Sequence, residues 1–182
     1  MMEVNKVDHI LRAAGAATGQ KLFVLIGSAA IFAWQTIVPA EMAMTREVDL
    51  FAYDVDAATA ESIAFEIDGS LGQASQFDAT YGYYCDGVGP DTAILPTDWQ
   101  TRAKEYLSPG TEGVKAIVPH PDDIALAKLC AGREKDYSWL VAAIRGGMIE
   151  PSAMRERLDR LPADRTPDRQ TLETRLDSVV RR

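Results

Sequence analysis

The feature that most constrains the fold is an apolar strand that ends in a glycine-serine pair and leads directly into a helical stretch. Residues 21–26 predict a short buried strand, and Gly27 and Ser28 follow it without a linker. The next residues, Ile31 to Trp34, suit a helix whose first turn begins at this pair. Because free backbone N–H groups at such a turn favour an anion and glycine leaves the approach open, Gly27 and Ser28 are candidate phosphate-binding residues.

A second strand carries two carboxylates on one face. Residues 47–53 alternate acidic or small residues with apolar ones, so Glu47 and Asp49 project the same way and could share divalent metal ions. A Tyr-rich strand is predicted at about residues 80–85, and Asp86 at its end is the candidate third carboxylate. This combination indicates metal-assisted nucleotidyl transfer, with Glu47, Asp49 and Asp86 as catalytic residues that hold two divalent metal ions.

The remaining patterns predict an α/β fold with a small mixed sheet flanked by helices. Helices are expected at residues 3–17 and 57–68, a further strand at 113–118, and a short helix or turn at 99–106. Past Pro119 the chain reads as entirely helical, with segments at 121–131, 134–145, 151–161 and 167–180. We therefore expect a core at residues 1–119 and a helical C-terminal segment at residues 120–182 packed on it.

Charge and apolar patterning exclude several classes of protein. Residues 1–127 carry 7 Lys and Arg against 18 Asp and Glu, whereas residues 128–182 carry 12 against 9. The first part therefore does not suit a nucleic-acid surface, whereas the C-terminal part could contact phosphate. No apolar run approaches the ~20 residues of a transmembrane helix, and the N-terminus lacks a signal-peptide pattern, so a cytoplasmic protein without membrane contact is expected. Two cysteines 45 positions apart exclude a disulfide framework or a CxxC zinc site.

Four stretches of the chain resemble a known family. Residues 25–30 (LIGSAA) and 45–50 (TREVDL) are similar to the Gly-Ser and paired-acid motifs of the nucleotidyltransferase superfamily. Residues 81–90 (YGYYCDGVGP), with Leu95-Pro96 and Trp99, and residues 123–136 (DIALAKLCAGREKD) narrow the match. Together they resemble the DUF6036 nucleotidyltransferase-like proteins, relatives of the AbiEii toxin family, from about Phe23 to Leu161.

The resemblance implies a nucleotidyltransferase fold followed by helices, with an NTP as substrate and magnesium as cofactor. It also implies an RNA or protein acceptor and a toxin-antitoxin or phage-defence setting, with a cognate antitoxin or toxin as partner. By the same analogy, Lys128, Arg133 and Lys135 would face the nucleotide phosphates or the acceptor.

Simpler interpretations of the same residues stay open. Gly27-Ser28 could be an ordinary turn with a helix cap, Glu47 and Asp49 the solvated face of an edge strand, and Asp86 a turn residue before Gly87. The cations of 128–135 could form ordinary surface ion pairs with Glu134 and Asp136.

Two alternative functions belong to other classes of protein. The first acid of the pair is Glu47, where active members of the superfamily usually carry Asp, which favours a catalytically inactive module that binds a nucleotide or a partner protein. A weaker alternative is an antitoxin-like partner whose acidic face covers a basic toxin.

Overall fold

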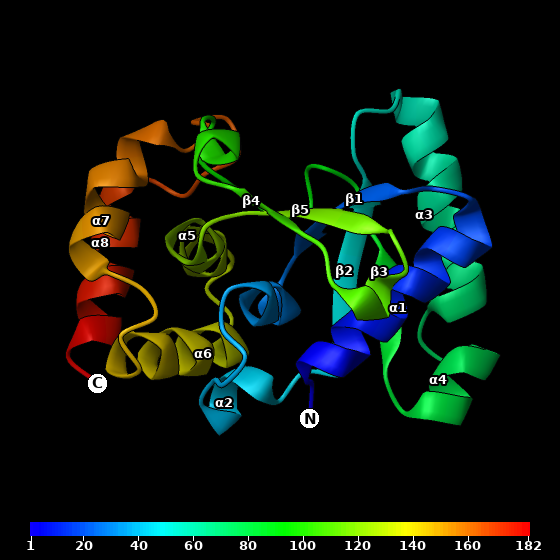
Figure 1. Ribbon diagram of the computed structural model, residues 1–182. Helices are drawn as coiled ribbons and strands as arrows, with labels where there is room; N and C mark the ends of the chain where they lie inside the picture. Colours follow the sequence, from blue (N-terminus) through cyan, green and yellow to red (C-terminus); the bar gives the residue numbers. More distant parts are fainter.

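The computed structural model describes all 182 residues and contains one five-stranded mixed sheet surrounded by helices (Figure 1). The strands are β1 (Leu22–Ile26), β2 (Glu47–Ala52), β3 (Tyr84–Gly87), β4 (Lys104–Tyr106) and β5 (Lys115–Val118), in the order β3-β2-β1-β5-β4. β1 pairs antiparallel with β2 and parallel with β5, β2 pairs parallel with β3, and β4 pairs antiparallel with β5. The expected α/β fold class with a small mixed sheet is confirmed.

Helices flank the strands of this sheet. The α-helices are α1 (Val4–Thr18), α2 (Ala40–Ala43), α3 (Ala57–Leu71), α4 (Gln76–Tyr81), α5 (Pro121–Ala131), α6 (Glu134–Arg145), α7 (Pro151–Arg157) and α8 (Arg169–Val180). Short 3₁₀ helices are η1 (Ser28–Ala33), η2 (Trp99–Thr101), η3 (Pro109–Thr111) and η4 (Leu158–Arg160). In Figure 1, α1, α3 and α4 lie to one side of the strands and α5 to α8 to the other. None of these helices combines the length and apolarity needed to cross a bilayer.

The two faces of the sheet are buried to different extents. Because side chains alternate along a strand, Phe23 and Leu25 of β1 join a cluster of 40 buried residues that extends from α1 to α8. Val24 and Ile26 point to the opposite face, where only Phe51 and Leu95 complete a four-residue buried cluster. The second face is therefore thinly covered, and it leaves room for the clefts described below.

The Tyr-rich strand begins later than the sequence indicates. Residues 76–81 form α4, because the Ser75 hydroxyl caps the helix by accepting from the Asp78 N–H and Gly82 ends it with a φ of 75°. The strand β3 starts only at Tyr84 and keeps Asp86 inside it. Local capping thus outweighs the strand propensity of the tyrosines.

Three smaller differences concern lengths and types of elements. The helix expected after Ser28 is the six-residue 3₁₀ helix η1, and α3 continues past Gly69 to Leu71. Residues 99–106 contain η2 as expected, but also the edge strand β4. A three-residue strand has too short a pattern for period-2 analysis to detect.

Candidate functional site

Gly27 places the end of β1 against the acidic strand. Its φ of 73° lies in the region that favours glycine, and a Cβ at this position would lie 1.9 Å from Oδ2 of Asp49. Asp49 faces this point because it pairs with Ile26 in the antiparallel β1–β2 ladder. The glycine is therefore required both for the turn and for the approach of the carboxylate.

The predicted carboxylates come from two adjacent parallel strands. In the β2–β3 ladder Asp49 lies opposite Asp86, and Glu47 lies opposite Tyr84. Glu47 and Asp49 share the thinly covered face of the sheet, in line with the alternation of the sequence, because both line one cleft. All three acids are thus neighbours at one end of β2 and β3.

A cleft of about 230 Å³, here called the acidic cleft, collects most of the predicted residues. Its walls include Gly27, Ser28, Glu47, Asp49, Lys128 and Arg133, together with Ile26, Thr92, Ala93, Leu95, Ile124, Ala127 and Ala131. Lys135 lies outside this lining but reaches Glu47, with 3.3 Å between Nζ and Oε1. Asp86 also lies outside the lining, beside Asp49.

The surroundings of Asp49 disfavour the ionised form of its carboxylate. Burial, followed by repulsion from Glu47 and Asp86, raises its pKa to about 7. The pKa of Asp86 is raised by burial and then by Glu47 and Asp68. A cation between these groups would relieve the repulsion, so their arrangement favours positive charge in the cleft.

Lys128 supplies a buried positive charge on the opposite wall. Its side chain is 8% exposed, and Nζ lies 2.8 Å from the Ser28 Oγ and 3.3 Å from Oδ1 of Asp136. Burial lowers its pKa, although Asp136 opposes the shift. The ammonium group also lies 5.0 Å from the centre of the Trp139 ring.

Asp136 is a residue of this site that the sequence pattern assigned only to surface ion pairs. Its side chain is 1% exposed and binds Lys128 and also Arg133, whose Nε lies 2.6 Å from Oδ2. Gly132, with a φ of 62°, ends α5 and allows α6 to begin at Glu134, which brings both cations to one carboxylate. The pairing with Asp136 is therefore buried rather than a surface contact.

Tyr84 is a second residue that the sequence pattern did not identify. Its hydroxyl lies 3.2 Å from Oε2 of Glu47, while Lys135 holds the other oxygen. Its place in the sequence could have identified Tyr84, because it lies two residues before Asp86 on the same strand and so shares its face.

The donor set suits magnesium by its chemistry, since three carboxylates supply the oxygen ligands that the ion prefers. In this conformation no three Asp, Glu, His or Cys side chains are grouped closely enough to hold a metal ion. Glu47 would have to exchange its contacts with Tyr84 and Lys135 to reach an ion beside Asp49.

The helix that follows Gly27 is too short to attract a phosphate by itself. The six-residue η1 replaces the expected α-helix, so its aligned dipoles are few. The main attraction for an anion at Ser28 therefore comes from the Lys128 ammonium group.

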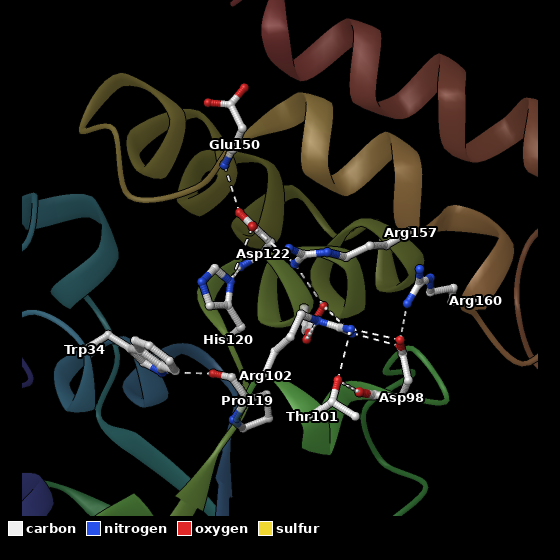
Figure 2. Close-up of polar contacts among 11 residues, drawn as sticks. Trp34, Asp98, Thr101, Arg102, Pro119, His120, Asp122, Glu150, Arg157 and Arg160 are labelled. Atoms are coloured by element: carbon white, nitrogen blue, oxygen red, sulfur yellow. Dashed lines mark hydrogen bonds and ion pairs between the residues drawn. The ribbon is translucent and has the colours of Figure 1, made fainter. Parts of the chain in front are cut away.

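An ionic network holds the loop that covers the acidic cleft (Figure 2). Arg102 binds Asp98 through two bonds of 2.9 Å and the fully buried Asp123 through Nε at 3.0 Å. Arg157 reaches Asp123 at 3.3 Å from α7, and Arg160 binds Asp98 from η4. We call these five residues the loop network, because they tie residues 88–103 to α5 and to the C-terminal helices.

Comparison with known proteins gives one match. No curated protein and no solved structure matches the chain significantly. The family described as nucleotidyltransferases of unknown function, DUF6036, matches residues 3–175, a longer span than the motifs indicated. The chain, with its Gly27 turn, acid pair and buried Lys128, therefore belongs to the DUF6036 family of nucleotidyltransferases of unknown function.

Proposed function

We propose that the protein transfers a nucleoside monophosphate from an NTP to an RNA or protein acceptor, with release of pyrophosphate and with the help of divalent metal. The observation that carries the proposal is the contact between Gly27 and Asp49, with Glu47 on the same strand and Asp86 on the adjacent strand. Family membership supports the reaction class. Neither the geometry of the site nor the family membership specifies the acceptor or the biological setting.

Each group has a role that its position supports. Lys128 and Arg133 would neutralise the triphosphate, and Ser28 would donate a hydrogen bond to a phosphate oxygen at the Gly27 turn. Glu47, Asp49 and Asp86 would hold Mg²⁺, which supplies charge neutralisation and alignment of the phosphates. With a pKa of about 7, Asp49 can hold or release a proton near neutral pH before a cation binds.

The setting that we propose is a toxin-antitoxin or phage-defence system with a cognate partner protein. The acidic first two thirds of the chain support a basic partner rather than a broad nucleic-acid surface there. An RNA acceptor would be drawn to residues 128–182, where cations outnumber carboxylates.

A second candidate function is a binding module without catalysis. One observation favours it: apart from Asp49 and Asp86, the charges in and around the acidic cleft are already paired within the protein. Glu47 is bonded to Tyr84 and Lys135, and Asp136 binds Lys128 and Arg133. A module of this kind would retain the cleft but would not need a closed set of metal ligands.

Calorimetric titration with ATP, GTP, CTP and UTP, with and without Mg²⁺, tests the site. The Glu47→Ala, Asp49→Ala double variant is expected to lose the metal-dependent part of NTP binding, because the remaining Asp86 cannot hold an ion alone. The Glu66→Ala, Asp164→Ala variant changes two exposed carboxylates away from the cleft and should bind like wild type.

Labelled NTPs then distinguish the two functions. Transfer of label to RNA or protein by wild type but not by the double variant would support the enzyme. Metal-dependent binding without transfer to any acceptor would favour the binding module, and absence of NTP binding would contradict both nucleotide-based proposals.

A further inference from the structure

A second and larger cleft adjoins the acidic cleft on the same face of the sheet. It encloses about 780 Å³, within the range of small-molecule sites, and we call it the aromatic cleft. Phe51 and Tyr53 form its floor, while Leu95 and Trp99 of the covering loop line it with them. Leu95, together with Ala93, lines both clefts, so the two are neighbours.

The two clefts follow the same strand. Val48, Leu50 and Ala52 point into the large cluster, whereas Phe51 and Tyr53 belong to the opposite face, so the acid pair and the aromatic pair face the same way along β2. The Tyr53 N–H still bonds to the Leu22 carbonyl at 3.2 Å, which keeps this residue in register past the end of the strand. Side chains two apart on a strand are separated by roughly 6.6 Å. A nucleotide that has its phosphates at the Gly27 turn and extends along β2 would have its other end beside Phe51 and Tyr53.

The walls of the aromatic cleft suit a flat and uncharged group. Eleven of its 21 lining residues are hydrophobic, and Tyr53 and Trp99 are only half-buried. The single cation among the lining residues, Arg165, is paired with Asp91 at the rim. Asp54 and Glu61 add negative charge, so a polyphosphate is disfavoured here.

The wall opposite β2 is held in place before any ligand binds. The loop network fixes Asp98 next to Trp99, and the Thr97 N–H bonds to the Arg160 carbonyl at 2.8 Å. Pro162 and Arg165 then close the cleft from the C-terminal part of the chain. A slot with fixed aromatic walls costs a flat ligand little reorganisation.

We infer that the aromatic cleft receives the nucleobase of the NTP, with its phosphates at Gly27, Ser28 and Lys128. The inference rests on the proposed function and adds to it the place of the base. Stacking on Tyr53 or Trp99 and contact with Phe51 and Leu95 would hold any base by its flat face. Selectivity among bases would come from the polar groups at the rim of the cleft.

The test compares NTPs with inorganic tripolyphosphate, which carries the phosphates without a base. Ala60 is half-buried on α3 and lines the aromatic cleft, whereas Ala58 is exposed on the same helix and does not. Ala60→Trp should fill the cleft and weaken binding of each NTP by about tenfold or more, since base stacking is lost. Tripolyphosphate binding with Mg²⁺ should be unchanged, and Ala58→Trp should alter neither ligand.

Tyr53→Leu gives a second measurement that keeps an apolar side chain without an aromatic ring. It should also weaken NTP binding by ~10-fold and spare tripolyphosphate, because the face on which a base stacks is lost. Circular dichroism of each variant confirms that it is folded.

The outcomes separate the inference from the proposed function. NTP binding that is unchanged in Ala60→Trp and Tyr53→Leu would place the base elsewhere, and so would equal weakening of NTP and tripolyphosphate. Either result overturns the inference while the phosphate site survives. If wild type bound neither NTP nor tripolyphosphate, the proposed function would fail and the inference with it. Normal NTP binding with impaired transfer would instead assign the aromatic cleft to the acceptor.

Discussion

At the residue scale, Gly27 and Asp49 constrain each other. The carboxylate occupies the space where any other residue at position 27 would place its Cβ, and the backbone conformation there is one that glycine adopts readily. A change at either residue therefore acts on the other.

Gly27→Ala should weaken NTP binding by about tenfold, equivalent to ~1.4 kcal/mol, because Asp49 must move. Gly19→Ala is a matched control, since Gly19 has a φ of 74° and no atom lies within 4 Å of the place that an added Cβ would take. Gly19→Ala should lose about 1 kcal/mol of unfolding free energy from backbone strain, and Gly27→Ala should lose more, because its ψ of −164° is almost restricted to glycine and Asp49 must also move. Urea denaturation measures both losses. Equal NTP affinity in the two variants would contradict a role for the Gly27–Asp49 contact.

The raised pKa of Asp49 predicts a pH-dependent cost to stability. The folded protein keeps a proton on Asp49 up to about pH 7, whereas the unfolded chain loses it near pH 4. The unfolding free energy of wild type should therefore fall as pH rises through this window. Asp49→Asn lacks the ionisation and should gain up to about 4 kcal/mol over wild type by pH 8, measured by urea denaturation at each pH.

Magnesium provides the control for this prediction. If the ion binds Asp49, millimolar Mg²⁺ should stabilise wild type at pH 8 but leave Asp49→Asn unchanged. Parallel pH profiles of the two proteins would show that Asp49 titrates normally.

Much of the candidate site could be predicted residue by residue. Gly27, Ser28, Glu47 and Asp49 follow from one strand-turn pattern and one alternating strand, and the structure brings them to one cleft. The partners of these groups could not be predicted, since Asp136 meets Lys128 only through the corner at Gly132. Such contacts depend on tertiary packing, which periodicity does not encode.

At the scale of elements, the loop network joins three segments of the chain through one buried carboxylate. Asp123 lies in the first turn of α5 and is fully buried, with Arg102 and Arg157 as its partners. Removal of one member leaves buried charges without compensation, which costs more than the pair itself contributes.

Asp123→Ala is therefore expected to lower the unfolding free energy by about 3–5 kcal/mol. Asp159→Ala breaks the exposed Asp159–Arg169 ion pair and should cost ~1 kcal/mol or less. Chemical denaturation of both variants measures the difference, and similar losses would show that the loop network adds no more than a surface pair.

Elements were predictable where their patterns were long. α1 matches its helical periodicity closely, and α5 and α6 match the segments expected on either side of Gly132. β1 and β2 match the apolar run and the alternation. β4 escaped detection because its three residues hold an edge position through pairing with β5. The predicted start of the Tyr-rich strand, at about residue 80, was wrong because the Ser75 cap and Gly82 bound a helix there.

At the scale of the whole molecule, one hydrophobic cluster joins the N-terminal and C-terminal parts. It includes Leu11 of α1, Leu25 of β1, Leu129 of α5 and Leu176 of α8. The division at residue 119 stays a prediction about sequence organisation, and the shared cluster leads us to expect cooperative unfolding.

Tryptophan fluorescence can test this cooperativity. A Trp34→Phe, Trp99→Phe variant reports on Trp139 in the C-terminal helices, and Trp139→Phe reports on the other two. In each variant the fluorescence and far-UV circular dichroism curves in urea should share one midpoint, as expected for a single transition. Separate midpoints would show that residues 120–182 unfold as an independent unit.

The closure of the aromatic cleft by Pro162 and Arg165 has a consequence for protein synthesis. A ribosome makes the Gly27 turn and all five strands before it reaches the residues that close the cleft and anchor its loop through Arg160. A growing chain thus contains the acidic strand early but completes the aromatic cleft only after residue 165 has emerged. The base binding that we infer would therefore become available only after residues 160–165 have been made.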